Sequence, residues 1–154
     1  MFGILYIAWF LSFFIKIRYL TGGFGLFLTA VLITKLGDIG AYLVGMRFGR
    51  TPLIPHVSPK KSIEGSLGGL LFSVLGALIS RVFLNFSYLH MIFLGIFLGI
   101  LGQLGDLSES LIKRDCQVKD SGNLIAGMGG VLDLIDSLLF TGPVFYFYMS
   151  IILK

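Results

Sequence analysis

Charged residues are scarce in this sequence: they make up 13% of its 154 residues, whereas 56% are hydrophobic. A soluble domain carries a larger charged and polar share, because its surface faces water. The mean hydropathy of +0.94 therefore indicates an integral membrane protein. It excludes collagen-like, disordered and nucleic-acid-binding classes, so we expect no nucleic-acid partner.

Cysteine is nearly absent as well, since Cys116 stands alone. A single cysteine excludes an internal disulfide and a thiolate metal cluster. The N-terminal stretch 1–15 is uncharged, with no basic region and no small-residue cleavage site before Lys16 and Arg18. We therefore expect no cleavable signal peptide, and we expect sequence to be missing upstream.

Uncharged stretches dominate what is present. A membrane-spanning helix needs about 20 apolar residues, so the length leaves room for about five spans and no separate soluble domain. We place the spans at 2–15, 21–46, 66–84, 88–112 and 131–153. The sequence thus predicts an all-α polytopic membrane protein, with residues 1–154 forming one transmembrane domain.

Two polar loops, 47–65 and 113–130, separate the spans on one side. Lysine and arginine gather on the cytoplasmic side of membrane proteins. These loops carry seven such residues, against four on the opposite side. We therefore predict that both loops and the site face the cytoplasm, with the protein in the inner, cytoplasmic membrane.

The acidic residues all fall on that same side. They are Asp38, Glu64, Asp106, Glu109, Asp115, Asp120, Asp133 and Asp136. Placing a carboxylate in the hydrocarbon of a membrane costs about 2.5–3.5 kcal/mol of free energy. Several carboxylates on three helices therefore require an interaction that compensates this cost. One reason is neutralisation by Lys35, Lys113 and Arg114, or placement at the interface. For the whole set we favour a shared polar cavity open to the cytoplasm.

Helical spacing sorts some of these acids onto common faces. Asp133 and Asp136 share one face, and Asp106 and Glu109 share another with Ser110 and Lys113. Hard oxygen ligands without a histidine or cysteine cluster suit Mg²⁺ better than zinc. Glycines at 127, 129 and 130 precede the last span, whose first free N–H groups favour an anion. The pattern predicts a phosphate and Mg²⁺ site, and we leave a second cation open.

Basic residues supply the other half of this site. Lys60 and Lys61 lie in a short loop with prolines, and Lys113, Arg114 and Lys119 form a second cationic set. Alone, either set is explained by topology or by attraction to anionic head groups. Interleaved with carboxylates and a glycine-rich helix start, they indicate phosphoryl or nucleotidyl transfer at a membrane surface.

Three blocks of residues follow one another along the chain. They are Asp38-Ile39-Gly40-Ala41-Tyr42; Ser58-Pro59-Lys60-Lys61-Ser62-Ile63-Glu64-Gly65; and Ser110-x-x-Lys113-Arg114, four residues, Lys119-Asp120-x-Gly122, then Gly127-x-Gly129-Gly130-x-x-Asp133-x-x-Asp136-Ser137. In this order they resemble the signature of the phosphatidate cytidylyltransferase family, also called CDP-diglyceride synthase, and the resemblance runs from about residue 30 to the end.

This resemblance implies transfer of CMP from CTP to phosphatidic acid, with a divalent metal in a cytoplasm-facing cavity. We assign the metal to Asp106, Asp133 and Asp136, and the catalytic role to Lys113, Arg114, Lys119 and Asp120. The substrate-binding assignments are Ser58, Lys60, Lys61, Glu64, Ser110, Gly129, Gly130 and Asp38. The nucleophile is the lipid's own phosphate, so no strong general base is needed.

Three positions depart from the family pattern, which usually has proline, histidine and arginine where this chain has Ala126, Met128 and Leu134. Met128 neither donates a proton nor binds hard metal, and Leu134 removes a phosphate fork. Family members usually carry further spans upstream, so the chain resembles their C-terminal catalytic portion.

Other functions stay open at this stage. A cation-coupled transporter also has intramembrane acids, but it predicts polar residues on both sides of the membrane. A CTP-dependent lipid-alcohol kinase needs a base to activate a hydroxyl. An inactive membrane fragment is a third alternative, and a homodimer is left open.

Overall fold

The computed structural model describes residues 2–55, 58–117 and 131–153, with the side chains of these residues except 2–6, 59 and 131–134. Five helices and one hairpin make up this part of the chain. In order they are α1 (Phe2–Arg18), α2 (Gly23–Phe48), β1 (Pro52–Ile54), β2 (Ser58–Ser62), α3 (Ile63–Ser80), α4 (Tyr88–Asp115) and α5 (Val131–Ile152).

The all-α polytopic class is confirmed. In the described part of the chain, α2, α3, α4 and the stretch Ile135–Ile152 of α5 are long and apolar enough to cross a membrane. The remaining helix, α1, has 17 residues, which is the lower limit for a span. Large apolar side chains are exposed on the helices, such as Leu89 at 78% and Ile151 at 74%, as expected for faces that meet lipid.

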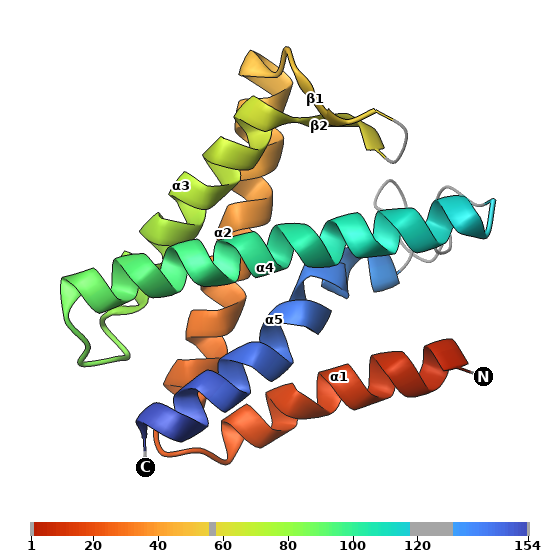
Figure 1. Ribbon diagram of the computed structural model, residues 1–154. Helices are drawn as coiled ribbons and strands as arrows, with labels where there is room; N and C mark the ends of the chain where they lie inside the picture. Colours follow the sequence, from red (N-terminus) through yellow and green to blue (C-terminus); the bar gives the residue numbers. More distant parts are fainter. Residues whose placement is uncertain (1, 56–57, 118–130, 154) are drawn as a thin grey trace.

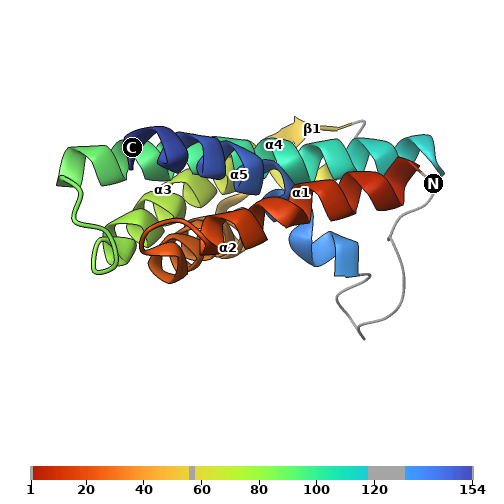
Figure 2. The same ribbon diagram turned by 90° about the horizontal axis from the view of Figure 1, so that it is seen from below.

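Helices α2 and α3 lie side by side, and α4 crosses them (Figure 1). Helix α5 packs against α4, and α1 packs against α5. Seen from below, the bundle is flat, with α4 and the C-terminal part of α5 on the side away from α2, whereas the first turns of α5 reach the level of α2 (Figure 2). The hairpin, the end of α4 and the start of α5 lie toward one side of the bundle, and the short connections 19–22 and 81–87 lie toward the other (Figure 1).

Small residues allow α2 and α3 to approach closely. A Cβ atom added to Gly68 of α3 would lie 2.5 Å from the Cβ of Val44 on α2. One added to Gly40 of α2 would collide with Phe72 of α3. Membrane helices associate through such close packing, because lipid provides little hydrophobic drive between them.

The hairpin between α2 and α3 was not predicted, because residues 47–65 were expected to form a loop. The two strands pair antiparallel, with Pro52 opposite Ser62 and Ile54 opposite Ser58. The hairpin leads directly into α3, whose N-cap Ser62 accepts a hydrogen bond from the backbone N–H of Gly65 at 3.1 Å.

The second predicted loop, 113–130, was placed too early. Helix α4 continues to Asp115, so Lys113 and Arg114 lie on its last turn. Cations at a helix C-terminus are stabilised by the helix dipole, which favours this longer helix.

The core is apolar, with a few buried hydroxyl groups between helices. It includes Ile17 of α1, Leu26 and Ile33 of α2, and Leu94 and Leu98 of α4. The hydroxyl of Thr34 on α2 donates to the backbone oxygen of Ala30 at 2.8 Å and lies 3.4 Å from the hydroxyl of Thr141 on α5. These local bonds satisfy hydroxyl groups where water is absent.

Candidate active site

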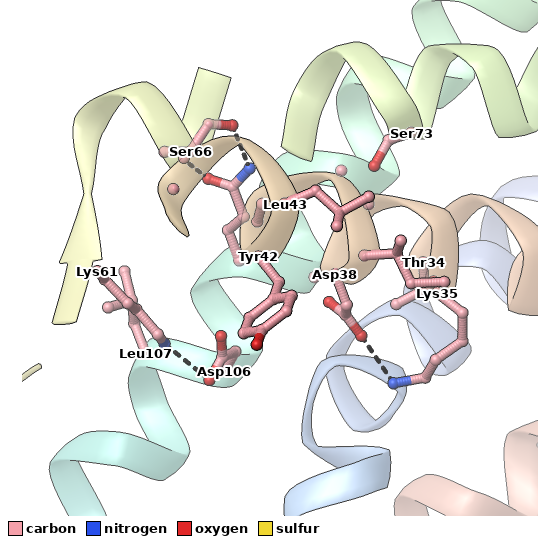
Figure 3. A pocket seen from close by; sticks show the side chains of 18 of the residues that line it. Thr34, Lys35, Asp38, Tyr42, Leu43, Lys61, Ser66, Ser73, Asp106 and Leu107 are labelled. Carbon is pink, nitrogen blue, oxygen red and sulfur yellow. Dashed lines mark hydrogen bonds and ion pairs between the residues drawn. The ribbon is translucent and has the colours of Figure 1, made fainter. Parts of the chain in front are cut away.

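A cavity of about 720 Å³ lies between α2, β2, α3, α4 and α5. Figure 3 shows polar and charged side chains of α2, β2, α3 and α4 around it. Among the described residues, its charged lining consists of three lysines and three aspartates: Lys35, Lys60, Lys61, Asp38, Asp106 and Asp136. Three of the eight acids for which a shared cavity was predicted therefore line one cavity, while its opening to the cytoplasm stays a prediction.

The first charged pair joins the hairpin to α4. The ammonium nitrogen of Lys61 lies 2.7 Å from Oδ1 of Asp106, and the two side chains are 26% and 38% exposed (Figure 3). Lys61 reaches this position because β2 ends just before α3 and so holds the lysine over the cavity. Lys61, which the sequence analysis assigned to substrate, and Asp106, which it assigned to metal, thus form a partly exposed ion pair whose ammonium nitrogen is buried.

The second charged pair lies on α2 and contacts α5. Lys35 Nζ is 2.7 Å from Oδ2 of Asp38, one helical turn away (Figure 3). The same nitrogen donates to Oγ of Ser137 at 3.2 Å, and that hydroxyl donates to Asp38 Oδ2 at 2.9 Å. Neutralisation of Asp38 by Lys35, one of the two explanations for intramembrane acids, is therefore observed together with the cavity.

Asp136 sits deeper, where α4 and α5 cross. It is 7% exposed, as is Glu109 of α4. The backbone oxygen of Asp136 would lie 2.9 Å from a Cβ at Gly105, so this glycine lets the two helices meet. The carboxyl groups of Glu109 and Asp106 are close enough to Asp136 to interact with it electrostatically. The crossing thus gathers three carboxyl groups from two helices.

These carboxyl groups have the donor chemistry of a Mg²⁺ site, since hard oxygen atoms are the ligands that this ion prefers. Among the residues that the structure describes, both side-chain oxygens of Glu109 are buried and accept no hydrogen bond, although Lys113 Nζ lies 3.4 Å from one of them. Within the described residues, no three histidine, cysteine or acidic side chains are already arranged to hold an ion. The proposed ligand Asp133 lies in α5, but its side chain is outside the described residues.

The other predicted residues divide into three groups. Ser58 and Lys60 line the cavity together with Lys61. Ser110, Lys113 and Arg114 lie on the last turns of α4 and are not among the described cavity residues. Four further residues fall outside the described part of the chain: Lys119, Asp120, Gly129 and Gly130.

Glu64 performs a local task at the base of the hairpin. Its carboxylate accepts hydrogen bonds from the backbone N–H groups of Arg50 at 3.1 Å and Thr51 at 3.2 Å. The hydroxyl of Thr51 donates to it at 3.0 Å. Glu64 is not among the described residues that line the cavity, so its assignment to substrate remains a prediction without a structural contact.

Two features of the cavity were missed from the sequence. Gln103 of α4 donates through Nε2 to the backbone oxygen of Ser66 on α3 at 2.9 Å, and its Oε1 accepts from the Ser66 hydroxyl. Tyr42 of α2 lies between the two charged pairs in Figure 3. An uncharged glutamine in an apolar helix is the signal that would have identified the first, because such groups need partners in a membrane.

Comparisons with known proteins agree with these blocks. The model of the family described as "Cytidylyltransferase family" matches residues 1–152. A protein of Bacillus subtilis named phosphatidate cytidylyltransferase is 39% identical over 150 residues, which cover 96% of this chain and 56% of the relative. A Synechocystis protein of the same name is 44% identical over 136 residues, covering 82% and 46%.

The name of a third relative states no activity. It is an Escherichia coli protein named "Uncharacterized protein YnbB", 40% identical over 149 residues, which cover 96% of this chain and 49% of that protein. The chain spans about half the length of these curated relatives. Since the family model covers nearly the whole sequence, the chain belongs to the cytidylyltransferase family.

Proposed function

We propose that this chain transfers CMP from CTP to phosphatidic acid, forming CDP-diacylglycerol and pyrophosphate. The observation that carries the proposal is one cavity that holds lysines beside carboxylates within an apolar helix bundle. Such a site admits phosphate groups to a membrane enzyme and leaves the acyl chains of the lipid in the bilayer. The printed names of the Bacillus and Synechocystis relatives support the same reaction.

In this reaction an oxygen of the phosphatidate phosphate attacks the α-phosphorus of CTP. The bond from that phosphorus to the bridging oxygen of the β-phosphate breaks, and pyrophosphate leaves with the electron pair. No proton has to be removed from the nucleophile, because a phosphate is already anionic. The chain therefore needs groups that hold and neutralise phosphates rather than a general base.

Lys60 and Lys61 are suited to that task. Both line the cavity from β2, and an ammonium group on a flexible stem meets phosphate as a mobile point charge. When substrate enters, Lys61 can exchange part of its contact with Asp106, 2.7 Å away, for a phosphate oxygen. Lys113, Arg114 and Lys119 remain the proposed cations for the departing pyrophosphate.

A bound Mg²⁺ would neutralise phosphate charge and polarise the α-phosphoryl group. Asp106 and Asp136, with Asp133, are the residues that we propose hold it, and Glu109 lies close enough to Asp136 to support it. We also propose that the hairpin side of the bundle faces the cytoplasm, where CTP is found, in the inner membrane. The excess of basic residues on that side supports this orientation.

The position of the transferred phosphorus separates this proposal from a CTP-dependent kinase. Purified protein is incubated with phosphatidic acid or diacylglycerol and with CTP labelled at the α- or at the γ-phosphorus. We expect the α-label in a lipid product and the γ-label in pyrophosphate. A lipid that carries the γ-label would establish a kinase instead, and no label in any lipid would contradict both activities.

A further inference from the structure

A lysine and an aspartate meet near the middle of a membrane-spanning helix. Lys35 lies 12 residues after the first residue of α2 and 13 before the last. A charged side chain at the centre of a span costs about 2.5–3.5 kcal/mol even on the mildest scale. A charged residue at this position therefore requires interactions that offset its cost, and the contacts of Lys35 provide them.

The contacts form a closed triangle between α2 and α5. Lys35 Nζ binds Asp38 Oδ2 at 2.7 Å and Ser137 Oγ at 3.2 Å, while Ser137 Oγ donates to the same aspartate oxygen at 2.9 Å. Ser137 is fully buried and directly follows Asp136, which lines the cavity. The triangle therefore fixes the turn of α5 that carries Asp136 against α2.

Lys35 also has a distinct place in the charge balance of the cavity. The described lining holds three lysines and three aspartates, and two of the lysines come from β2. Helix α5 contributes no lysine or arginine between residues 135 and 153. Among the described residues that line the cavity, Lys35 is thus the one cationic side chain that comes from a helix.

We propose that Lys35 is a further positioning residue of this cavity, which ties Asp38 of α2 to Ser137 of α5 and balances the carboxylates on that wall. The inference rests on the proposed function, because it assigns Lys35 to the same phosphate and metal site. Its charge favours phosphate groups and opposes excessive binding of cations, and its hydrogen bonds hold the acidic turn of α5 in place.

This role predicts effects of opposite sign on two ligands. Replacing Lys35 by methionine keeps the length of the side chain but leaves the wall with one extra negative charge. A cation should then bind more tightly and an anion more weakly, by about tenfold each, which corresponds to about 1.4 kcal/mol. A residue needed only for folding would weaken both ligands together.

The experiment uses the full chain in detergent and needs no turnover. Binding of Mn²⁺ alone is measured by electron paramagnetic resonance, and binding of CTP in EDTA is measured by equilibrium dialysis. The variants are Lys35→Met, Lys35→Arg and the double variant Lys35→Met/Asp38→Asn. Lys16→Met is the matched control, because Lys16 is an exposed lysine at the end of α1.

We expect Lys35→Met to bind Mn²⁺ about tenfold more tightly and CTP about tenfold more weakly, with Lys35→Arg and Lys16→Met within about threefold of the parent protein. The double variant removes one charge of each sign, so both affinities should return toward the parent values. Formation of CDP-diacylglycerol by the double variant should nevertheless fall at least tenfold, because the ion pair of Lys35 with Asp38 and the hydrogen bond of Lys35 to Ser137 are both lost.

Other results would overturn the inference. In Lys35→Met, an equal loss of affinity for Mn²⁺ and CTP, or no change in either affinity, would overturn it. So would a parent protein that binds neither ligand, or a double variant with full activity. If Lys35→Met does not fold, the double variant decides: parental affinities with at least a tenfold loss of CDP-diacylglycerol formation support the inference, and full activity overturns it. If Lys35→Met shows the opposing shifts but the parent protein forms no CDP-diacylglycerol, the proposed function would be contradicted and the charge-balancing role of Lys35 would stand.

Discussion

Replacing Lys61 should lower the activity of the protein strongly and its stability only slightly. The ammonium nitrogen of Lys61 is buried 2.7 Å from Asp106, while the two side chains as a whole are 26% and 38% exposed, so water screens the pair only in part. Partly exposed ion pairs contribute about 1 kcal/mol to stability. Lys61→Met should therefore lower the free energy of unfolding by no more than about 1 kcal/mol.

The effect on activity should be much larger. Removal of a single preorganised donor to a developing oxyanion costs about 2.7–4 kcal/mol, or 10²–10³ in rate. If Lys61 meets a substrate phosphate, kcat/KM of Lys61→Met should fall by about that factor. Asp106→Asn should also lose activity, and the double variant should be no worse than the more damaged single variant, because residues that act as a unit are not additive.

The assay is formation of CDP-diacylglycerol in mixed micelles that contain phosphatidic acid, with CTP varied. Circular dichroism during heating reports the unfolding midpoint of the same samples, and Lys16→Met is the control for loss of a lysine elsewhere. A Lys61→Met protein with kcat/KM within threefold of the parent value would refute the reasoning. The Lys61–Asp106 contact would then be a surface ion pair without a role in phosphate binding.

Three further predictions concern the metal, the topology and the helix packing. Asp133→Asn should abolish turnover without affecting membrane insertion, since an amide keeps the shape but loses the charge that binds Mg²⁺; near-parental turnover of purified protein would contradict this. In a background without Cys116, a cysteine at Ser58 should react with an impermeant thiol reagent from the cytoplasm and one at Ser87 from outside, and the reverse pattern would invert the orientation. Gly68→Ala should destabilise the protein by about 1–3 kcal/mol in thermal unfolding because its Cβ would meet Val44, and an unchanged midpoint would contradict the packing of α2 on α3.

Much of the fold follows from hydropathy alone. The predicted starts and ends of the five helices agree with the structure to within a few residues, because long uncharged stretches have few alternatives in a membrane. The hairpin was missed for a physical reason. Its second strand reads Ser-Pro-Lys-Lys-Ser, which has little intrinsic strand preference. Pairing with residues 52–54 and the bonds of Glu64 to the segment before β1 create the strand.

The sequence predicted which residues belong to the site but not which of them contact one another. Lys61 and Asp106 were both assigned to it, yet their sequence separation of 45 residues gives no indication that they touch. Their contact depends on how α4 crosses α3 and where the hairpin ends. Lys35 was considered only as a neutralising charge, because its contact with Ser137 depends on the packing of α2 against α5.

The most direct test of the proposed reaction is the stoichiometry of its products. The purified chain is reconstituted in liposomes that contain phosphatidic acid, and CDP-diacylglycerol and pyrophosphate are measured together after addition of CTP. We predict equal amounts of the two products with Mg²⁺, none with EDTA, and recovery when Mg²⁺ is restored. A folded, inserted protein that releases pyrophosphate without CDP-diacylglycerol, or that forms neither product with Mg²⁺, would contradict the proposal that this chain is a phosphatidate cytidylyltransferase.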